Sequence, residues 1–136
     1  MSAVRLAHPS AHYLALFEAA PIRFYPNEAE IEVALDSDPL TLSLPAEDRV
    51  ADPDAMAAAR SVMARIAELD ALASGYLFAS PGWPYGDDAR LWLLLVQPDN
   101  VRFCYAQNSV NDEQVIGFAR EGDDWVLTGP DPRRRG

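Results

Sequence analysis

The spacing of apolar residues changes once along this chain, and that change restricts the fold more than any other feature. Apolar side chains alternate with other residues over Ile31–Leu35 and again over Leu40–Leu44, which predicts two β-strands with one buried face each. The segment Asp36–Pro39 between them has the composition of a turn, so the two strands form a hairpin. From residue 53 onward apolar residues recur every three or four positions instead, and this spacing predicts an amphipathic helix.

The predicted helix covers residues 53–73 and begins with three favourable residues. Asp52 is a suitable N-cap, Pro53 occupies the first helical position, and Asp54 complements the helix dipole. Gly75 marks the expected end of the helix. One side of this helix carries an apolar stripe that is expected to lie across a sheet, made of Met56, Ala59, Val62, Met63, Ile66 and Leu69.

Strand patterns follow the helix in quick succession. Tyr76–Ala79 is a short candidate, and residues 90–96 are apolar on both faces, as in a central strand that is buried on both sides. Further strands are expected at Val101–Ala106, Gln114–Ala119 and Asp124–Thr128, joined by links short enough for antiparallel hairpins. The predicted fold class is therefore α+β, an antiparallel meander sheet with one long amphipathic helix packed on it.

The N-terminal stretch from Pro9 to Ala20 fits either a short helix capped by Ser10 or an extended segment, and Pro21 ends it in both cases. A length of 136 residues suits one domain, assigned here to residues 1–129, followed by a flexible Arg-rich tail at residues 130–136. No apolar run approaches the ~20 residues that span a bilayer, and the first residues lack a signal-peptide pattern. A cytoplasmic location is expected.

The charge of the chain excludes several classes of partner. Eleven basic and 21 acidic residues give a net charge of −10, and residues 1–129 alone carry eight arginines against 20 carboxylates, a net charge of −12. Such a body repels nucleic-acid phosphates and anionic lipids and attracts basic surfaces. We therefore expect another protein as the partner, rather than nucleic acid or a membrane.

The residues that carry chemistry form no recognised catalytic, cofactor or metal motif. Cys104 is the single cysteine and lies in an apolar stretch, which is typical of a small core residue. His8 and His12 are four residues apart, but two histidines without a further ligand make a weak metal site, and Pro9 disfavours a helix there. Phosphate-binding loops and nucleophile elbows are absent from the sequence. We therefore expect a protein that is not an enzyme and needs no cofactor.

Acidic pairs recur along the chain, and each lies beside turn residues or at a helix start: Asp36 and Asp38, Asp52 and Asp54, Asp87 and Asp88, Asp112 and Glu113, and Asp123 and Asp124. Asp is favoured in turns because its side chain bonds to the local backbone. None of the pairs has the spacing of a calcium loop. Together they are interpreted as an acidic face.

The segment 80–88 is the candidate binding loop. Trp83 and Tyr85 stand among prolines and glycines and lead into Asp87 and Asp88. Large aromatic residues carry much of the energy of protein interfaces, and neighbouring carboxylates attract arginine or lysine of a partner. In the alternative interpretation, Trp83 folds back and caps the end of the sheet.

The last third of the chain contains an aromatic strand at Val101–Tyr105, a Val-Asn-x-Glu step at Val110–Glu113, and Phe118 followed by Gly122 and Trp125. With the Asp-bearing hairpin and the helix before it, this order resembles small acidic bacterial immunity proteins of polymorphic toxin systems. The resemblance implies an antidote that binds a cognate toxin, often a basic one, in a stoichiometric complex. It carries over no catalytic residue.

Two other functions fit the same features. A secretion chaperone is also small, acidic and α+β, and it binds an effector segment along an apolar groove. The run from Phe118 through Gly122 to Trp125 also resembles the end of cone-shaped α+β isomerase-type domains. Such an enzyme needs an acid or base in an apolar pocket, and Asp36 or Tyr105 would be the candidates.

Overall fold

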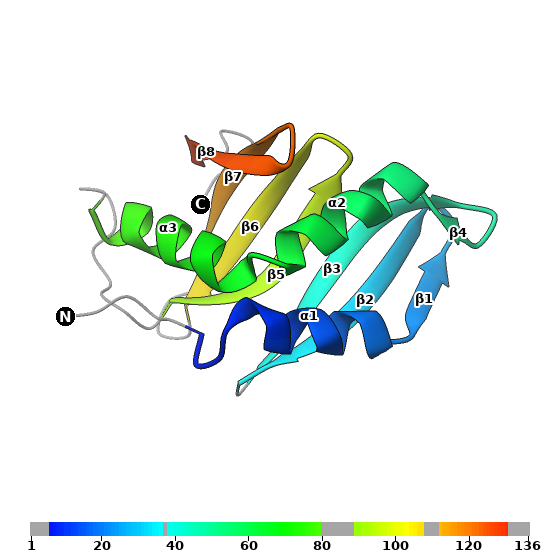
Figure 1. Cartoon of the computed structure of the whole chain (residues 1–136), viewed down its shortest axis with the longest axis horizontal. Helices are drawn as coiled ribbons and strands as arrows, with labels where there is room; N and C mark the ends of the chain where they lie inside the picture. The colour runs from blue at the N-terminus through cyan, green and yellow to red at the C-terminus, as the bar shows by residue number, and fades with distance from the viewer. Residues whose placement is uncertain (1–5, 37, 80–88, 108–111, 131–136) are drawn as a thin grey trace.

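The computed structural model describes residues 6–36, 38–79, 89–107 and 112–130. Its strands form one eight-stranded sheet in the order β1-β2-β3-β5-β6-β7-β8, with β4 paired to β3. The three helices lie over one face of this sheet (Figure 1). The elements are α1 (Ser10–Ala19), β1 (Ile22–Tyr25), β2 (Glu28–Leu35), β3 (Asp38–Glu47), β4 (Val50–Ala51), α2 (Pro53–Met63), α3 (Ile66–Ala79), β5 (Ala89–Gln97), β6 (Asn100–Gln107), β7 (Asp112–Glu121) and β8 (Asp124–Pro130).

The predicted hairpin is confirmed. Strands β2 and β3 pair antiparallel, with Ile31 opposite Leu42 and Val33 opposite Leu40. The side chains that alternate along the sequence are buried under the helices, because successive strand residues point to opposite faces. The segment before Pro21 is the helix α1. Ser10 does not cap it, because the cap position is Pro9 and the helix has no side-chain cap.

The single long helix predicted for residues 53–73 is wrong, because the chain forms two helices separated by Ala64 and Arg65. Contacts from distant segments stabilise the break. Ser10 Oγ accepts a hydrogen bond from the Ala67 amide at 2.9 Å, which satisfies a donor in the first turn of α3. Arg65 pairs with both Glu68 and Asp124.

Other parts of the helix prediction hold. The Ala55 amide donates to Asp52 Oδ2 at 3.1 Å, so Asp52 caps α2 as expected. The predicted stripe is buried apart from Met56, which is half-buried. The helix does not end at Gly75, however, and α3 continues to Ala79. The short strand predicted at Tyr76–Ala79 is therefore wrong.

The sheet is not an antiparallel meander throughout. Strand β5 pairs parallel to β3, with Thr41 opposite Leu93 and Ser43 opposite Leu95. The helices α2 and α3 form the crossover that a parallel connection requires. Beyond β5 the chain does form the expected meander, in which β5, β6, β7 and β8 pair antiparallel in sequence order.

Strand β5 is covered on one face only, so the prediction that both faces are buried is wrong. Leu91, Leu94 and Val96 point into the core, whereas Trp92 is 41% exposed. The pairing register with β6 shifts between Leu91 and Leu93, which places Trp92 at a bulge.

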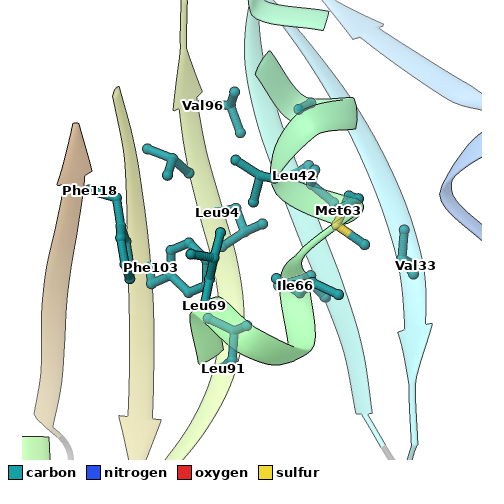
Figure 2. Packing of buried hydrophobic residues seen from close by; sticks show 14 of the residues in the cluster. Val33, Leu42, Met63, Ile66, Leu69, Leu91, Leu94, Val96, Phe103 and Phe118 are labelled. Atoms are coloured by element: carbon teal, nitrogen blue, oxygen red, sulfur yellow. The ribbon is translucent and has the colours of Figure 1, made fainter. Parts of the chain in front are cut away.

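The core lies between the helices and the sheet. Figure 2 shows Leu69 of α3 over Leu94 of β5 and Phe103 of β6, whereas Met63 at the end of α2 and Ile66 at the start of α3 lie toward β3. All five side chains are fully buried. No helix in the described part of the chain is both long enough and apolar enough to cross a membrane.

Candidate functional site

The predicted binding loop, with Trp83, Tyr85, Asp87 and Asp88, lies outside the described residues, so its role stays a prediction. Its described neighbours are the end of α3 and the start of β5. Because β5 runs parallel to β3, its start lies at the same end of the sheet as the turn between β2 and β3. The Arg133–Arg135 tail also lies outside the described residues.

Many carboxylates gather at the other end of the sheet. Strands β3, β5 and β7 finish there, and α2 begins there, since the Asp52 amide donates to Pro45 O at 2.9 Å. The Arg120 amide donates to Asp99 O at 2.9 Å, which joins two of the turns. We call this region the acidic end and define it by Glu47, Asp48, Asp52, Asp54, Asp99, Glu121, Asp123 and Asp124. Seven of the eight are exposed, and Asp52 is half-buried.

The turn between β3 and β4 forms a tip within the acidic end. Asp48 and Arg49 have φ angles of 55° and 63°, the left-handed region that residues other than glycine seldom adopt. The Arg49 guanidinium lies 5.7 Å from the centre of the Phe24 ring. A cation over an aromatic face is attracted to it, so this contact helps to hold the tip.

Two hollows flank this tip. One is lined by Phe24, Tyr25, Pro26, Asp48 and Arg49, and the other by Pro45, Ala46, Glu47, Val50, Ala51, Asp52 and Pro53. Tyr25 is 46% exposed and Val50 is 61% exposed. The acidic end thus presents an aromatic and an aliphatic side chain among carboxylates.

Two neighbours stabilise the ionised carboxylate of Asp124. The Trp125 amide donates to Asp124 Oδ1 at 2.8 Å, and Arg65 pairs with the same oxygen. The backbone hydrogen bond first, and then the arginine, lower the pKa of Asp124 below its ordinary value. Arg65 in turn has a raised pKa, because Glu68 and Asp124 accept its hydrogen bonds.

A second group of polar side chains is buried between α3 and β6. Tyr105 Oη donates to Asp70 Oδ1 at 2.6 Å, and Ser74 Oγ lies 3.5 Å from the same oxygen. All three residues are at most 2% exposed. Burial, followed by the charge of Asp70 and the hydrogen bond to it, raises the pKa of Tyr105 well above its ordinary value.

Sequence reasoning named Tyr105 but missed Asp70 and Ser74. A signal was present, because Asp70 and Ser74 are four residues apart and interrupt an apolar helical stretch. The three side chains form a hydrogen-bonded cluster, and their burial keeps them from a substrate in this structure. Their geometry suits the fixing of α3 on the sheet.

Asp36, the other proposed acid or base, lies at a different place, the turn after β2. Its carboxylate accepts hydrogen bonds from Tyr13 Oη at 2.7 Å and from the Ala7 amide at 2.9 Å. Partial burial acts to raise its pKa, but these donors outweigh that effect and lower it. The His8 amide donates to Tyr13 Oη at 3.1 Å, so the residues before α1 are tied to the hairpin.

The remaining candidates are the two histidines and the single cysteine. The His8 and His12 rings stack with their centres 4.1 Å apart. Among the residues that the structure describes, no group of three His, Cys, Asp or Glu side chains is placed to hold a metal ion. Cys104 is buried, as predicted.

Comparison of the chain with protein-family models, curated proteins and solved structures found no match.

Proposed function

We propose that this chain is a protein-binding inhibitor of the immunity type, which neutralises a basic bacterial toxin by forming a stoichiometric complex. The observation that carries the proposal is the acidic end, where carboxylates from three separate turns and a helix start share one end of the sheet, and where Glu47, Asp48 and Asp52 line the hollows beside the exposed Tyr25 and Val50. A surface of this kind fits a partner with arginine or lysine side chains around an apolar contact.

The two kinds of residue have different tasks in this complex. The carboxylates attract the basic partner over long range and raise its association rate, an effect that falls as salt rises. Tyr25 and Val50 enter apolar recesses of the partner and slow dissociation, because buried aromatic and aliphatic anchors carry much of the binding energy. The hollows beside them receive side chains of the partner in return.

The segment 80–88 offers a second surface for the same partner. The described residues that border it lie at the end of the sheet away from the acidic end. Substitutions at each surface therefore report on separate contacts.

The first experiment is purification of the tagged protein from its native bacterium at low salt, with identification of what elutes. A single basic protein that is released by salt and is toxic when expressed alone would support the proposal. Absence of any basic partner, or capture of partners with no shared charge, would contradict it.

Variants then assign the surface. The pair Tyr25→Ala and Val50→Ala is expected to weaken binding at least about 10-fold, mainly through faster dissociation. The set Asp48→Asn, Asp54→Asn, Asp99→Asn and Asp123→Asn is expected to slow association and to flatten its salt dependence. Glu18→Gln with Glu32→Gln, which removes exposed charge elsewhere, is the control. If only Trp83→Ala with Asp87→Ala weakens binding, the loop is the contact surface and the acidic end is not.

A secretion chaperone is the second candidate function. It is favoured by Trp92, which is 41% exposed at the bulge of β5, next to the half-buried Leu93 and Leu95. Recovery of a secreted effector that is not toxic by itself would favour this function over that of an antidote.

A further inference from the structure

The two outer strands of the sheet differ in how well they resist pairing with another strand. Strand β1 has four residues between Pro21 and Pro26, with Arg23 in its middle. Proline and charged side chains protect sheet edges against strand addition. Strand β8 instead carries Trp125, Val126, Leu127 and Thr128 in succession, with neither a charge nor a proline among them.

Hydrogen bonding shows which groups of β8 face outward. The Trp125 amide donates to the side chain of Asp124, so it does not donate to β7. Val126 lies opposite Ala119 and Leu127 lies opposite Phe118 in the ladder with β7. Because donors alternate sides along an antiparallel strand, the Leu127 amide points outward like that of Trp125. In the described part of the chain, no strand lies beyond β8.

We propose that β8 pairs antiparallel with β8 of a second copy of this chain, joining the two sheets across a twofold axis at Val126. In this arrangement Trp125 of each copy exchanges backbone hydrogen bonds with Leu127 of the other. The two Val126 side chains then meet in the central pair, where the strands approach most closely. Val126 is 40% exposed in the single copy, so pairing buries apolar surface there.

The two edge strands differ in the charged side chains that would meet on pairing with a second copy, and this difference favours β8. The same twofold arrangement at β1 places Arg23 directly against Arg23, and like charges across a strand pair are unfavourable. At β8 the equivalent position is Val126, and Asp124 comes to lie opposite Thr128. The two acidic β7–β8 turns lie at opposite ends of the paired strands, about 20 Å apart, or about two and a half Debye lengths at physiological salt. Repulsion between them is therefore mostly screened.

Asp124 limits the strength of this contact. In the single copy its side chain occupies the Trp125 amide that the second copy needs. On pairing the carboxylate gives up this hydrogen bond and keeps its ion pair with Arg65. A register shift at Gly117 and Phe118 also limits the straight part of the edge to Trp125–Thr128. The dimer is accordingly reversible and concentration-dependent.

Sedimentation velocity of the full chain between about 5 µM and about 1 mM tests the proposal, because mass action drives reversible association within such a range. The wild type is expected to shift from monomer to dimer. Val126→Arg places two cations on the axis and is expected to remain monomeric. Val50→Arg makes the same substitution at an exposed valine far from β8 and is expected to dimerise like the wild type.

A second pair of variants tests the backbone hydrogen bond. Leu127→Ala and Leu127→Pro both remove the leucine side chain, but only proline removes the outward amide. The alanine variant is expected to dimerise and the proline variant is not, when both are compared under conditions where circular dichroism shows them folded. A wild type that stays monomeric throughout would overturn the proposal, as would equal behaviour of Val126→Arg and Val50→Arg. Failure here leaves the antidote proposal untouched, since that proposal needs no dimer.

Discussion

Two tyrosine–aspartate hydrogen bonds of nearly equal length stand in opposite environments in this protein. Tyr105 donates to Asp70 at 2.6 Å between α3 and β6, where both side chains are almost inaccessible. Tyr13 donates to Asp36 at 2.7 Å, and that carboxylate lies at the surface. Loss of the hydrogen bond should therefore cost more free energy of unfolding at the buried pair than at the surface pair, because water can replace a lost partner only at the surface.

The difference also separates a contact that acts on the whole fold from one that acts locally. The buried pair fixes a helix on the sheet, and a change there acts on the whole fold. The surface pair ties the residues before α1 to the β2–β3 hairpin, so a change there acts locally. Neither pair belongs to the acidic end, and binding of a partner can therefore be tested without disturbing either.

The largest effect is expected from Asp70→Ala. Its removal leaves the hydroxyl groups of Tyr105 and Ser74 buried without this acceptor, which should cost about 3 kcal/mol of unfolding free energy. Urea denaturation measures this value, and the melting temperature should fall by roughly 10 °C. Asp70→Asn keeps an acceptor oxygen and is expected to recover part of the loss. A cost below about 1 kcal/mol for the alanine variant would show that water reaches the cluster.

The next effect compares the two tyrosines directly. Tyr105→Phe removes a donor from a buried carboxylate and is expected to destabilise the fold by about 2 kcal/mol. Tyr13→Phe removes the equivalent donor from a carboxylate that water can reach, and about 1 kcal/mol or less is expected. Parallel urea titrations of the two variants give both values. Equal losses would mean that the surface pair is as dry as the buried one.

The two tyrosine–aspartate pairs should also differ in how the free energy of unfolding changes at alkaline pH, because each tyrosine has a different pKa in the folded and unfolded states. The pKa of Tyr105 is raised in the folded state, so its contribution is complete below pH ~10 and is lost as the pH rises toward the folded value. Tyr105→Phe should therefore lose less stability than the wild type between pH ~9 and ~12. The pKa of Tyr13 is also raised, first by burial and then by Asp36, and Tyr13→Phe is the matched control. The steeper change is expected from Tyr105, and the reverse order would contradict the assignment.

The smallest effect is expected from Asp36 at acid pH. Its pKa is lowered in the folded state, so the stabilisation is present above pH ~4 and disappears as the pH falls through the folded value. Since the group is largely exposed, the contribution should be below about 1 kcal/mol. Asp36→Asn should abolish this part of the acid dependence, as measured by thermal unfolding between pH ~2 and ~6. Glu32→Gln removes an exposed carboxylate from β2, the strand that leads into this turn, and an identical profile for it would contradict a special role of Asp36.

Local patterns in the sequence predicted several elements well. The β2–β3 hairpin follows from alternation around Asp36–Pro39, and the start of α2 follows from Asp52 and Pro53. Both depend on residues within a few positions of each other, so the interactions that stabilise them can be predicted from the sequence. The role of segment 80–88 stays untested, because Trp83, Tyr85, Asp87 and Asp88 lie outside the described residues.

The acidic end was predicted only in part. The predicted acidic face included Asp52, Asp54, Asp123 and Asp124, but it also included Asp36 and Asp38, which lie at the opposite end of the sheet. Asp54, Asp99 and Asp123 are far apart in sequence, and each taken alone is an ordinary turn or helix-start residue. They share one end of the sheet only because β5 runs parallel to β3. The buried cluster was within reach, since the i, i+4 spacing of Asp70 and Ser74 on an apolar helix is visible in the sequence.

By itself the sequence determined an acidic α+β chain, the apolar faces of its strands, and the helix start at Asp52. Only the tertiary structure decided that the helix breaks at Ala64 and Arg65, that the crossover is parallel, and which carboxylates come together. The physical reason is that alternation and capping arise from neighbours along the chain. The break depends instead on contacts from Ser10 and Asp124, and the strand order depends on how two helices bury the stripe that the sequence had already marked.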